Sequence, residues 1–249
     1  IGSYSGAILG KMMNGLPGLF AGMAVGVVIS VIVAFLVGLP TLRLKGDYLA
    51  IATLGVAEII RVAVTNMKIT NGAAGISGVP LTNTWTITYI ALVLTTILIL
   101  NYTFSSAGRA TYAVLQDEIA AESMGVQVTK YKILAFVLGA ATASIGGTLS
   151  ATTLGAVTPS DFTFMKSIDV LIIVVFGGIG SFTGSFVAAV LLGIINLVLQ
   201  PFGQLRMIIY AVALILIMIF RPGGLLGTWE FKLGDFKFSK KKETKESGK

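Results

Sequence analysis

Cysteine and histidine are both absent from this 249-residue sequence, and charged residues make up only 12% of it. Without these two residue types the sequence offers no disulfide, thiolate metal site, thiol nucleophile or imidazole acid–base pair. Soluble domains are about a quarter charged, whereas this sequence is 55% hydrophobic and has a mean hydropathy of +0.91. The composition therefore indicates a membrane protein. The net charge of +7 indicates no nucleic-acid partner, because the excess lysine lies in one tail and in loops.

Seven apolar segments are candidates for crossing a bilayer, which takes about 20 apolar residues per helix. They are residues 16–39, 48–66, 85–104, 131–154, 168–176, 186–199 and 207–220. The run 168–176 is too short to cross alone, so we expect either a broken or re-entrant helix or a tight turn after it. The predicted fold class is all-α, a polytopic membrane helix bundle of one domain, residues 1–227. The lysine-rich tail 228–249 is predicted to be disordered, with attraction to anionic lipid as the alternative.

The distribution of lysine and arginine predicts the orientation, because these residues concentrate on the cytoplasmic side. If the loop 104–132 is cytoplasmic, thirteen of the 18 lysines and arginines lie inside, seven of them in the tail, and four lie outside. We therefore expect a cytoplasmic C-terminus.

Small residues recur every fourth position in two of the predicted spans. Gly18, Gly22 and Gly26 form one run, and a second run is formed by Gly139, Ala143, Gly147, Ala151 and Gly155. Spacing of four places each run on one helix face, where small residues allow close helix packing in lipid. Both helices are predicted to be interior.

Two sets of polar or glycine-rich positions at membrane depth are candidates for the translocation route or for packing. Glu58 and Arg61 are spaced i, i+3 within a span, so that they can pair. Two roles stay open for Glu58 and Arg61: they line a water-filled route, or they form an ion pair that fixes helix packing. The glycine-rich stretches TNGAAGISGVP and GGIGSFTGS supply Asn71, Gly72 and Gly75, and Gly177, Gly178 and Gly180. Neither stretch has the P-loop pattern, so ATP coupling needs a partner protein.

The stretch DEIAAESMG, residues 117–125, is a charged island between two spans. Asp117 and Glu118 favour the start of a short helix, and Gly125 favours its end. So short a helix is stable only when packed, either on its own bundle or on a partner. From the residues alone, a surface loop helix and a docking element both stay open.

The stretch IAAESMG resembles the cytoplasmic coupling segment E-A-A-x-x-x-G of ABC importer permeases, with Ile119 in place of the glutamate. Further stretches narrow the resemblance to the LivM-type permeases of branched-chain amino acid ABC transporters. They are GLPTLRLKGDYLAIATLGVAEIIR, TNGAAGISGVP, GRATYAVLQDEIAAESMGVQVTKYKILAFVLGA, VTPSDFTFMKSIDVLIIVVFGGIGSFTGS and IFRPGGLLG. The similarity runs from about Gly2 to Gly227. The resemblance implies that the first spans of the family would precede Ile1. The lysine-rich tail lies outside the region of similarity.

The resemblance implies a permease subunit without enzymatic activity, in the cytoplasmic (inner) membrane of a bacterium or archaeon. Its partners would be two ABC ATPase subunits, which use ATP and Mg, a second and distinct permease, and an extracytoplasmic substrate-binding protein. The implied ATPase-coupling residues are Asp117, Glu118, Ile119, Ala120, Ala121, Glu122, Ser123, Met124 and Gly125. The implied cargo is leucine, isoleucine and valine. The alternatives are a related importer for other amino acids, amides or urea, and an ion-coupled secondary carrier using Glu58.

Overall fold

The computed structural model describes residues 1–44, 46–178, 180–199, 201 and 212. The chain divides into two compact units, residues 1–164 and 165–249, and each unit is described by itself. The predicted span 207–220 (except for residue 212) and the predicted disordered tail 228–249 lie outside the described residues.

Five described helices are long and apolar enough to cross a membrane. They are α2 (Leu16–Thr41), α3 (Asp47–Asn66), α4 (Trp85–Phe104), α7 (Val128–Leu154) and α9 (Phe182–Leu199). Each overlaps a predicted span, and α4 coincides with its prediction. The remaining predicted segment forms α8 (Phe164–Gly177), whose 14 residues extend about 21 Å, less than the bilayer core of about 30 Å. The predicted all-α polytopic bundle is confirmed.

Three helices of the first unit, α1 (Gly2–Met12), α2 and α7, pack closely on one another. The contact between α1 and α2 is made by two glycine rows. A Cβ atom at Gly22 would lie 2.8 Å from the Cα of Gly6, and one at Gly18 would lie 3.2 Å from the Cα of Gly10. Lipid provides no hydrophobic drive for helix association, so this backbone approach supplies much of the attraction. The predicted interior face of α2 is confirmed.

The buried face of α2 continues beyond the predicted run. Ser30, Ala34 and Gly38 are buried and keep the spacing of four. A Cβ at Gly38 would meet the side chain of Phe136 on α7 at 3.4 Å. The stripe therefore contacts α1 with its first half and α7 with its second.

The second predicted run of small residues is only partly correct. Ala151 is buried and Gly147 contacts Ser3, but Ala143 is exposed, and a Cβ at Gly139 would meet nothing within 4 Å. The buried face of α7 instead contains Ser144, Thr148 and Thr152. Hydroxyls can replace glycines there because each of the two threonines bonds a carbonyl of its own helix. Thr148 also donates to the carbonyl of Gly2, 3.0 Å away, which ties α7 to α1.

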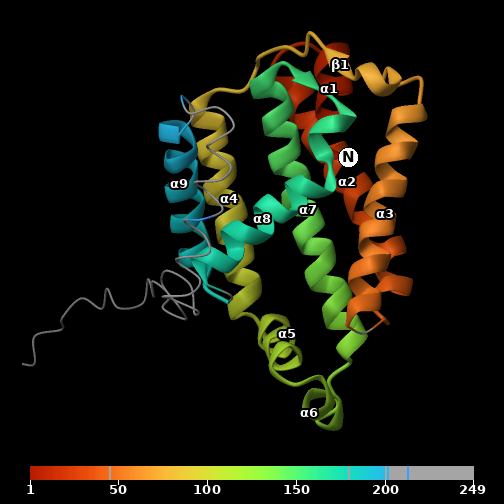
Figure 1. The fold of residues 1–249 in the computed structure, drawn as a ribbon, viewed down its shortest axis with the longest axis vertical. Helices are drawn as coiled ribbons and strands as arrows, with labels where there is room; N and C mark the ends of the chain where they lie inside the picture. Colours follow the sequence, from red (N-terminus) through yellow and green to blue (C-terminus); the bar gives the residue numbers. More distant parts are fainter. Residues whose placement is uncertain (45, 179, 200, 202–211, 213–249) are drawn as a thin grey trace, which may run out of the picture. The chain divides into compact units, whose positions relative to one another are not determined.

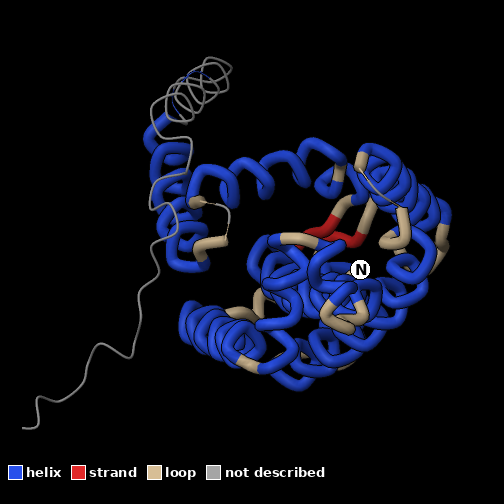
Figure 2. The backbone as a smooth tube through the Cα atoms, turned by 90° about the horizontal axis from the view of Figure 1, so that it is seen from below, coloured by secondary structure: helices blue, strands red, loops and turns tan. Residues whose placement is uncertain are grey.

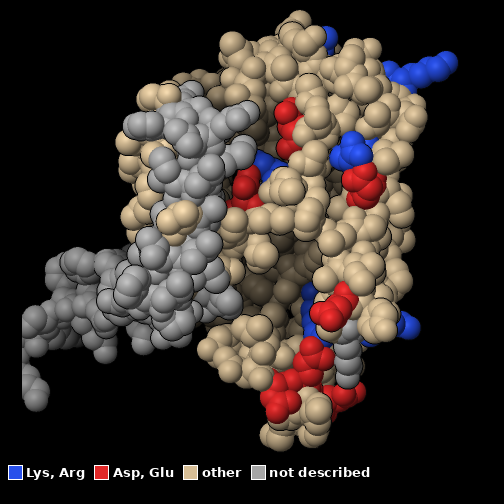
Figure 3. Space-filling view, viewed as in Figure 1, with Lys and Arg blue, Asp and Glu red and all other residues tan. Residues whose placement is uncertain are grey.

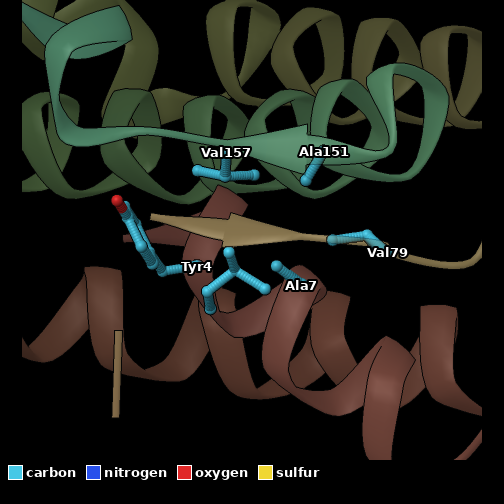
Figure 4. Close-up of a cluster of buried hydrophobic side chains, with 6 residues drawn as sticks. Tyr4, Ala7, Val79, Ala151 and Val157 are labelled. Atoms are coloured by element: carbon cyan, nitrogen blue, oxygen red, sulfur yellow. The ribbon is translucent and has the colours of Figure 1, made fainter. Parts of the chain in front are cut away.

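A short β-link joins the loops at one end of the first unit. Strand β1 (Ile76–Ser77) pairs antiparallel with β2 (Ala156–Val157), as Figure 2 shows in red. The link is part of a small apolar cluster formed by Tyr4, Ala7, Ile76, Val79, Ala151 and Val157 (Figure 4). In the first unit, helices α5 (Ser106–Gln116) and α6 (Glu118–Ser123) lie at the opposite end from this link (Figure 1).

Candidate functional site

The predicted coupling stretch folds as a capped two-turn helix, α6. The Asp117 carboxylate accepts hydrogen bonds from the amides of Ile119 and Ala120, at 2.8 and 3.1 Å. Gly125 has a φ of +81°. Its amide donates to the carbonyl of Glu122, and the amide of Val126 donates to that of Ala121. These two bonds form a Schellman motif, which only a residue tolerant of positive φ completes without strain.

Helix α6 is held to its own bundle by a few contacts. Ala121 is 5% exposed, and Glu118 forms an ion pair with Lys132 near the start of α7. Helix α5 precedes it, begins at the N-cap Ser105, and is connected to α6 through Asp117 alone. The helix is therefore positioned from both sides, by α5 and by α7.

The outward face of α6 carries unusual side chains for a surface helix. Ile119 is 76% exposed and Met124 is 85% exposed. Acidic side chains gather at this end of the first unit (Figure 3), and α6 itself contains Glu118 and Glu122. A cavity of about 750 Å³ lies beside the helix, lined by Glu122, Gly125 and Lys130 and by Phe35 of α2. Exposed large apolar side chains next to a hollow are typical of a protein-interaction surface.

Glu58 and Arg61 of α3 form the expected i, i+3 pair. The Arg61 Nε donates to both carboxylate oxygens of Glu58, at 3.1 and 2.9 Å. The Glu58 side chain is 54% exposed, that of Arg61 is 32% exposed, and no described residue of α3 is buried. The pair thus lies on an uncovered face of a membrane-spanning helix.

The first glycine-rich stretch forms the turn between α3 and the β-link. Asn71 and Gly72 adopt left-handed backbone with φ of 59° and 62°, and Gly75 has a φ of 71°. The side-chain amide of Asn71 donates to the carbonyl of Gly75 at 3.0 Å and closes the turn. A Cβ at Gly75 would lie 2.9 Å from the Cα of Thr158, so the close approach to the neighbouring loop requires glycine. These three residues lie at the end of the bundle opposite α6.

The second glycine-rich stretch joins α8 to α9 in the second unit. Gly178 and Gly180 have φ of 115° and 94°, and the end of α8 at Gly177 approaches Gly184 of α9 closely. The amide of Gly184 donates to the hydroxyl of Ser181, 3.0 Å away, at the start of α9. The described residues of the stretch form the end of α8, the connection to α9 and the first turn of α9. It belongs to a separate unit from the other candidate residues.

A largely apolar groove with hydroxyl side chains in its walls lies between α4 and α7, and the sequence analysis did not predict it. It has a volume of about 530 Å³, and hydroxyl side chains from both helices line it. At one end the Asn83 amide donates to Thr88 on α4 and to Thr153 on α7, at 2.9 and 2.7 Å. The signal in the sequence is weak, since threonines at helical spacing are common in membrane helices.

Comparison with known proteins identifies the chain. Residues 1–220 match the family described as "Branched-chain amino acid transport system / permease component". The chain belongs to this family. No solved structure is significantly similar to it.

Two curated relatives are named "High-affinity branched-chain amino acid transport system permease protein LivM". The chain is 36% identical to the protein from Salmonella typhimurium and 34% identical to that from Escherichia coli K12, in each case over 91% of this chain and 61% of the relative. The permease protein LivH of E. coli K12 is 30% identical over 57% of this chain and 46% of its own length. The chain thus spans about three fifths of the length of the LivM proteins that it matches.

Proposed function

We propose that this chain is a permease subunit of an ATP-driven importer for leucine, isoleucine and valine. The family match over residues 1–220 carries the proposal, together with the cargo in the names of the LivM and LivH relatives. The chain would act in the cytoplasmic membrane of a bacterium or archaeon, with its C-terminus inside. It would form part of the translocation route and perform no hydrolysis itself.

Helix α6 is the proposed contact with an ATPase subunit. It stands at one end of the membrane-spanning helices, presents Ile119 and Met124 outward, and is rimmed by acidic residues that would favour a basic groove. Its caps keep it helical without a partner, so that docking costs little ordering entropy. The ion pair to Lys132 links it to α7, the central helix of the first unit.

The connection between α6 and α7 would couple ATP binding to movement of the membrane helices. A ligand shifts a conformational equilibrium only when it binds the two states differently. ATP, acting through two ATPase subunits, would close them and displace α6. Because α7 packs on both α1 and α2, displacement of its cytoplasmic end would tilt the whole three-helix group. Solute would be delivered by an extracytoplasmic binding protein, and a second, distinct permease would complete the route.

The docking role is tested by changing an exposed residue of α6 without disturbing the fold. The Met124→Lys variant places a positive charge in the proposed interface, where its burial against a partner with a basic groove would be unfavourable. We expect ATP-dependent leucine uptake to fall at least tenfold and the ATPase subunits to be lost on purification. The Gln116→Lys variant, which adds the same charge at an exposed site in α5, is the matched control. Normal uptake and normal co-purification of the Met124→Lys variant would refute the docking role.

A further inference from the structure

We propose that the groove between α4 and α7 is one wall of the solute route and takes a zwitterionic amino acid with an aliphatic side chain. The proposal rests on the proposed function and adds to it a location and a set of contacting residues. None of the groove residues belongs to α6, to the Glu58–Arg61 pair or to the two glycine-rich stretches.

The groove follows one face of each helix. On α4 it is lined by Thr88, Ala91, Leu92 and Thr95, which are spaced i, i+3, i+4 and i+7. On α7 its lining runs from Thr142 to Leu154, a distance of about 18 Å at 1.5 Å per residue. Both helices are candidate membrane spans, so the groove extends through about half of the bilayer core. Its volume of about 530 Å³ lies within the range of small-molecule sites.

The hydroxyls of the groove are oriented as hydrogen-bond acceptors. The side chains of Thr95, Thr142 and Thr153 donate their protons to carbonyls of their own helices, at 2.8, 3.1 and 2.7 Å. The oxygens of Thr95 and Thr142 keep lone pairs that can accept from a solute, whereas the oxygen of Thr153 already accepts from Asn83. An ammonium group carries three donors and no acceptor, so these two oxygens, one on each helix, complement it.

The remaining lining suits an aliphatic cargo. Leu92, Ile145 and Leu149 provide apolar surface between the hydroxyls, and none of the described residues that line the groove is charged. A fixed charge would hold one end of a zwitterion strongly, whereas transport requires that the solute leave as readily as it enters. Weak acceptors and apolar surface meet this requirement.

Asn83 closes one end of the groove. Its amide nitrogen bridges Thr88 on α4 and Thr153 on α7, while its side-chain oxygen is buried and has no hydrogen-bond partner among the described residues. An unpaired buried acceptor destabilises the arrangement that buries it. The Asn83 bridge thus closes the groove at the end of the bundle opposite α6. Breaking the bridge would release the unpaired Asn83 oxygen from its buried position.

The groove also has unfilled space beside a glycine. A Cβ at Gly146, on the groove face of α7, would meet nothing within 4 Å. Gly146 is exposed, whereas the buried residues Gly6 and Gly22 lie in close helix contacts. Gly146 therefore keeps the groove wide and does not bring helices together within the described chain.

The test uses the absence of cysteine from the sequence. The Ala91→Cys variant places one thiol in the groove, and the Val93→Cys variant places one about 200° around α4 at almost the same depth. The complete transporter, reconstituted in liposomes, is treated with a charged methanethiosulfonate reagent, which needs a hydrated thiolate. We expect the Ala91→Cys variant to react faster than the Val93→Cys variant by about tenfold or more. We also expect leucine to slow its reaction during ATP-driven transport.

Equal reaction of the two variants, or no reaction of either, would overturn the proposal, since the groove would then face lipid or hold a packed helix. Fast reaction without protection by leucine, in a transporter that takes up leucine, would also overturn it. Absence of ATP-dependent leucine uptake by the unsubstituted transporter would instead refute the proposed function, and the cargo named here with it.

A second pair of variants tests the groove by filling it. The Gly146→Leu variant fills the open space, while the Gly55→Leu variant fills open space on α3, outside the groove. We expect the first to assemble with its partners yet lose at least nine tenths of uptake, and the second to keep its uptake. Loss of a partner permease from the Gly146→Leu variant would show a helix-packing surface and contradict the route. Normal uptake by that variant would contradict it equally.

Discussion

The glycine contact between α1 and α2 allows a stability prediction from two matched substitutions. The Gly22→Ala variant places a Cβ 2.8 Å from the Cα of Gly6 and 3.3 Å from the carbonyl oxygen of Ser5. Both neighbours are backbone atoms, so the helices must separate to accommodate it. The Gly55→Ala variant places a Cβ where nothing lies within 4 Å, in the middle of α3.

Overpacking of this kind costs about 1–3 kcal/mol of unfolding free energy. For a chain of this size, each kcal/mol lowers Tm by about 2–4 °C, so the Gly22→Ala variant should lose about 2–12 °C. The Gly55→Ala variant gains helix propensity of about 0.5–1 kcal/mol and should keep or slightly raise Tm. Both values are measured in detergent, as the temperature at which half of the protein leaves the monodisperse peak in size-exclusion chromatography. A Gly22→Ala variant as stable as the unsubstituted protein would refute close glycine packing of α1 on α2.

Three further predictions address the other candidate residues. The Asp117→Ala variant removes both cap hydrogen bonds of α6, at a cost of about 0.5–2 kcal/mol. We therefore expect faster amide exchange in residues 117–125 and reduced uptake, and we expect the Asp117→Asn variant to restore both. Unchanged amide exchange in Asp117→Ala would contradict the capping role of Asp117. The Gly75→Ala variant introduces strain at a φ of 71° and a clash with Thr158, so proteolysis of the adjoining loop should become faster and Tm should fall; protection equal to that of the unsubstituted protein would contradict it. If the Glu58–Arg61 pair is structural, the Glu58→Leu variant should lose expression, because it leaves Arg61 unpaired. The double variant Glu58→Leu, Arg61→Leu should then regain both expression and uptake. Regained expression without uptake would assign the pair to the translocation route.

The sequence predicted the short helix α6 and its caps more closely than the packing of the bundle. Asp117 and Gly125 act through local backbone bonds, and local bonds follow from residue type and spacing. The prediction of a small-residue packing face on α2 was also correct, because glycines have no other role on an apolar helix. Gly139 and Ala143 show the limit of this reasoning, since a run of small residues does not say which part of it meets a partner.

Long-range pairings could not be predicted from the residue pattern. The glycines of α1 were overlooked because an 11-residue helix is shorter than a span. The strands β1 and β2 are two residues long and lack the alternation that indicates a strand. Asn83 is an ordinary loop residue until the fold brings Thr88 and Thr153 beside it.

We propose that this chain works as the permease of an importer driven by separate ATPase subunits. The most direct test is to purify the tagged protein from its native membrane in mild detergent and identify its companions by mass spectrometry. We expect P-loop ATPase subunits and a second permease to co-purify with it, and the complex to take up leucine in liposomes only with ATP. Recovery of this chain alone, active in transport without ATP, would refute its role in an ATP-driven importer.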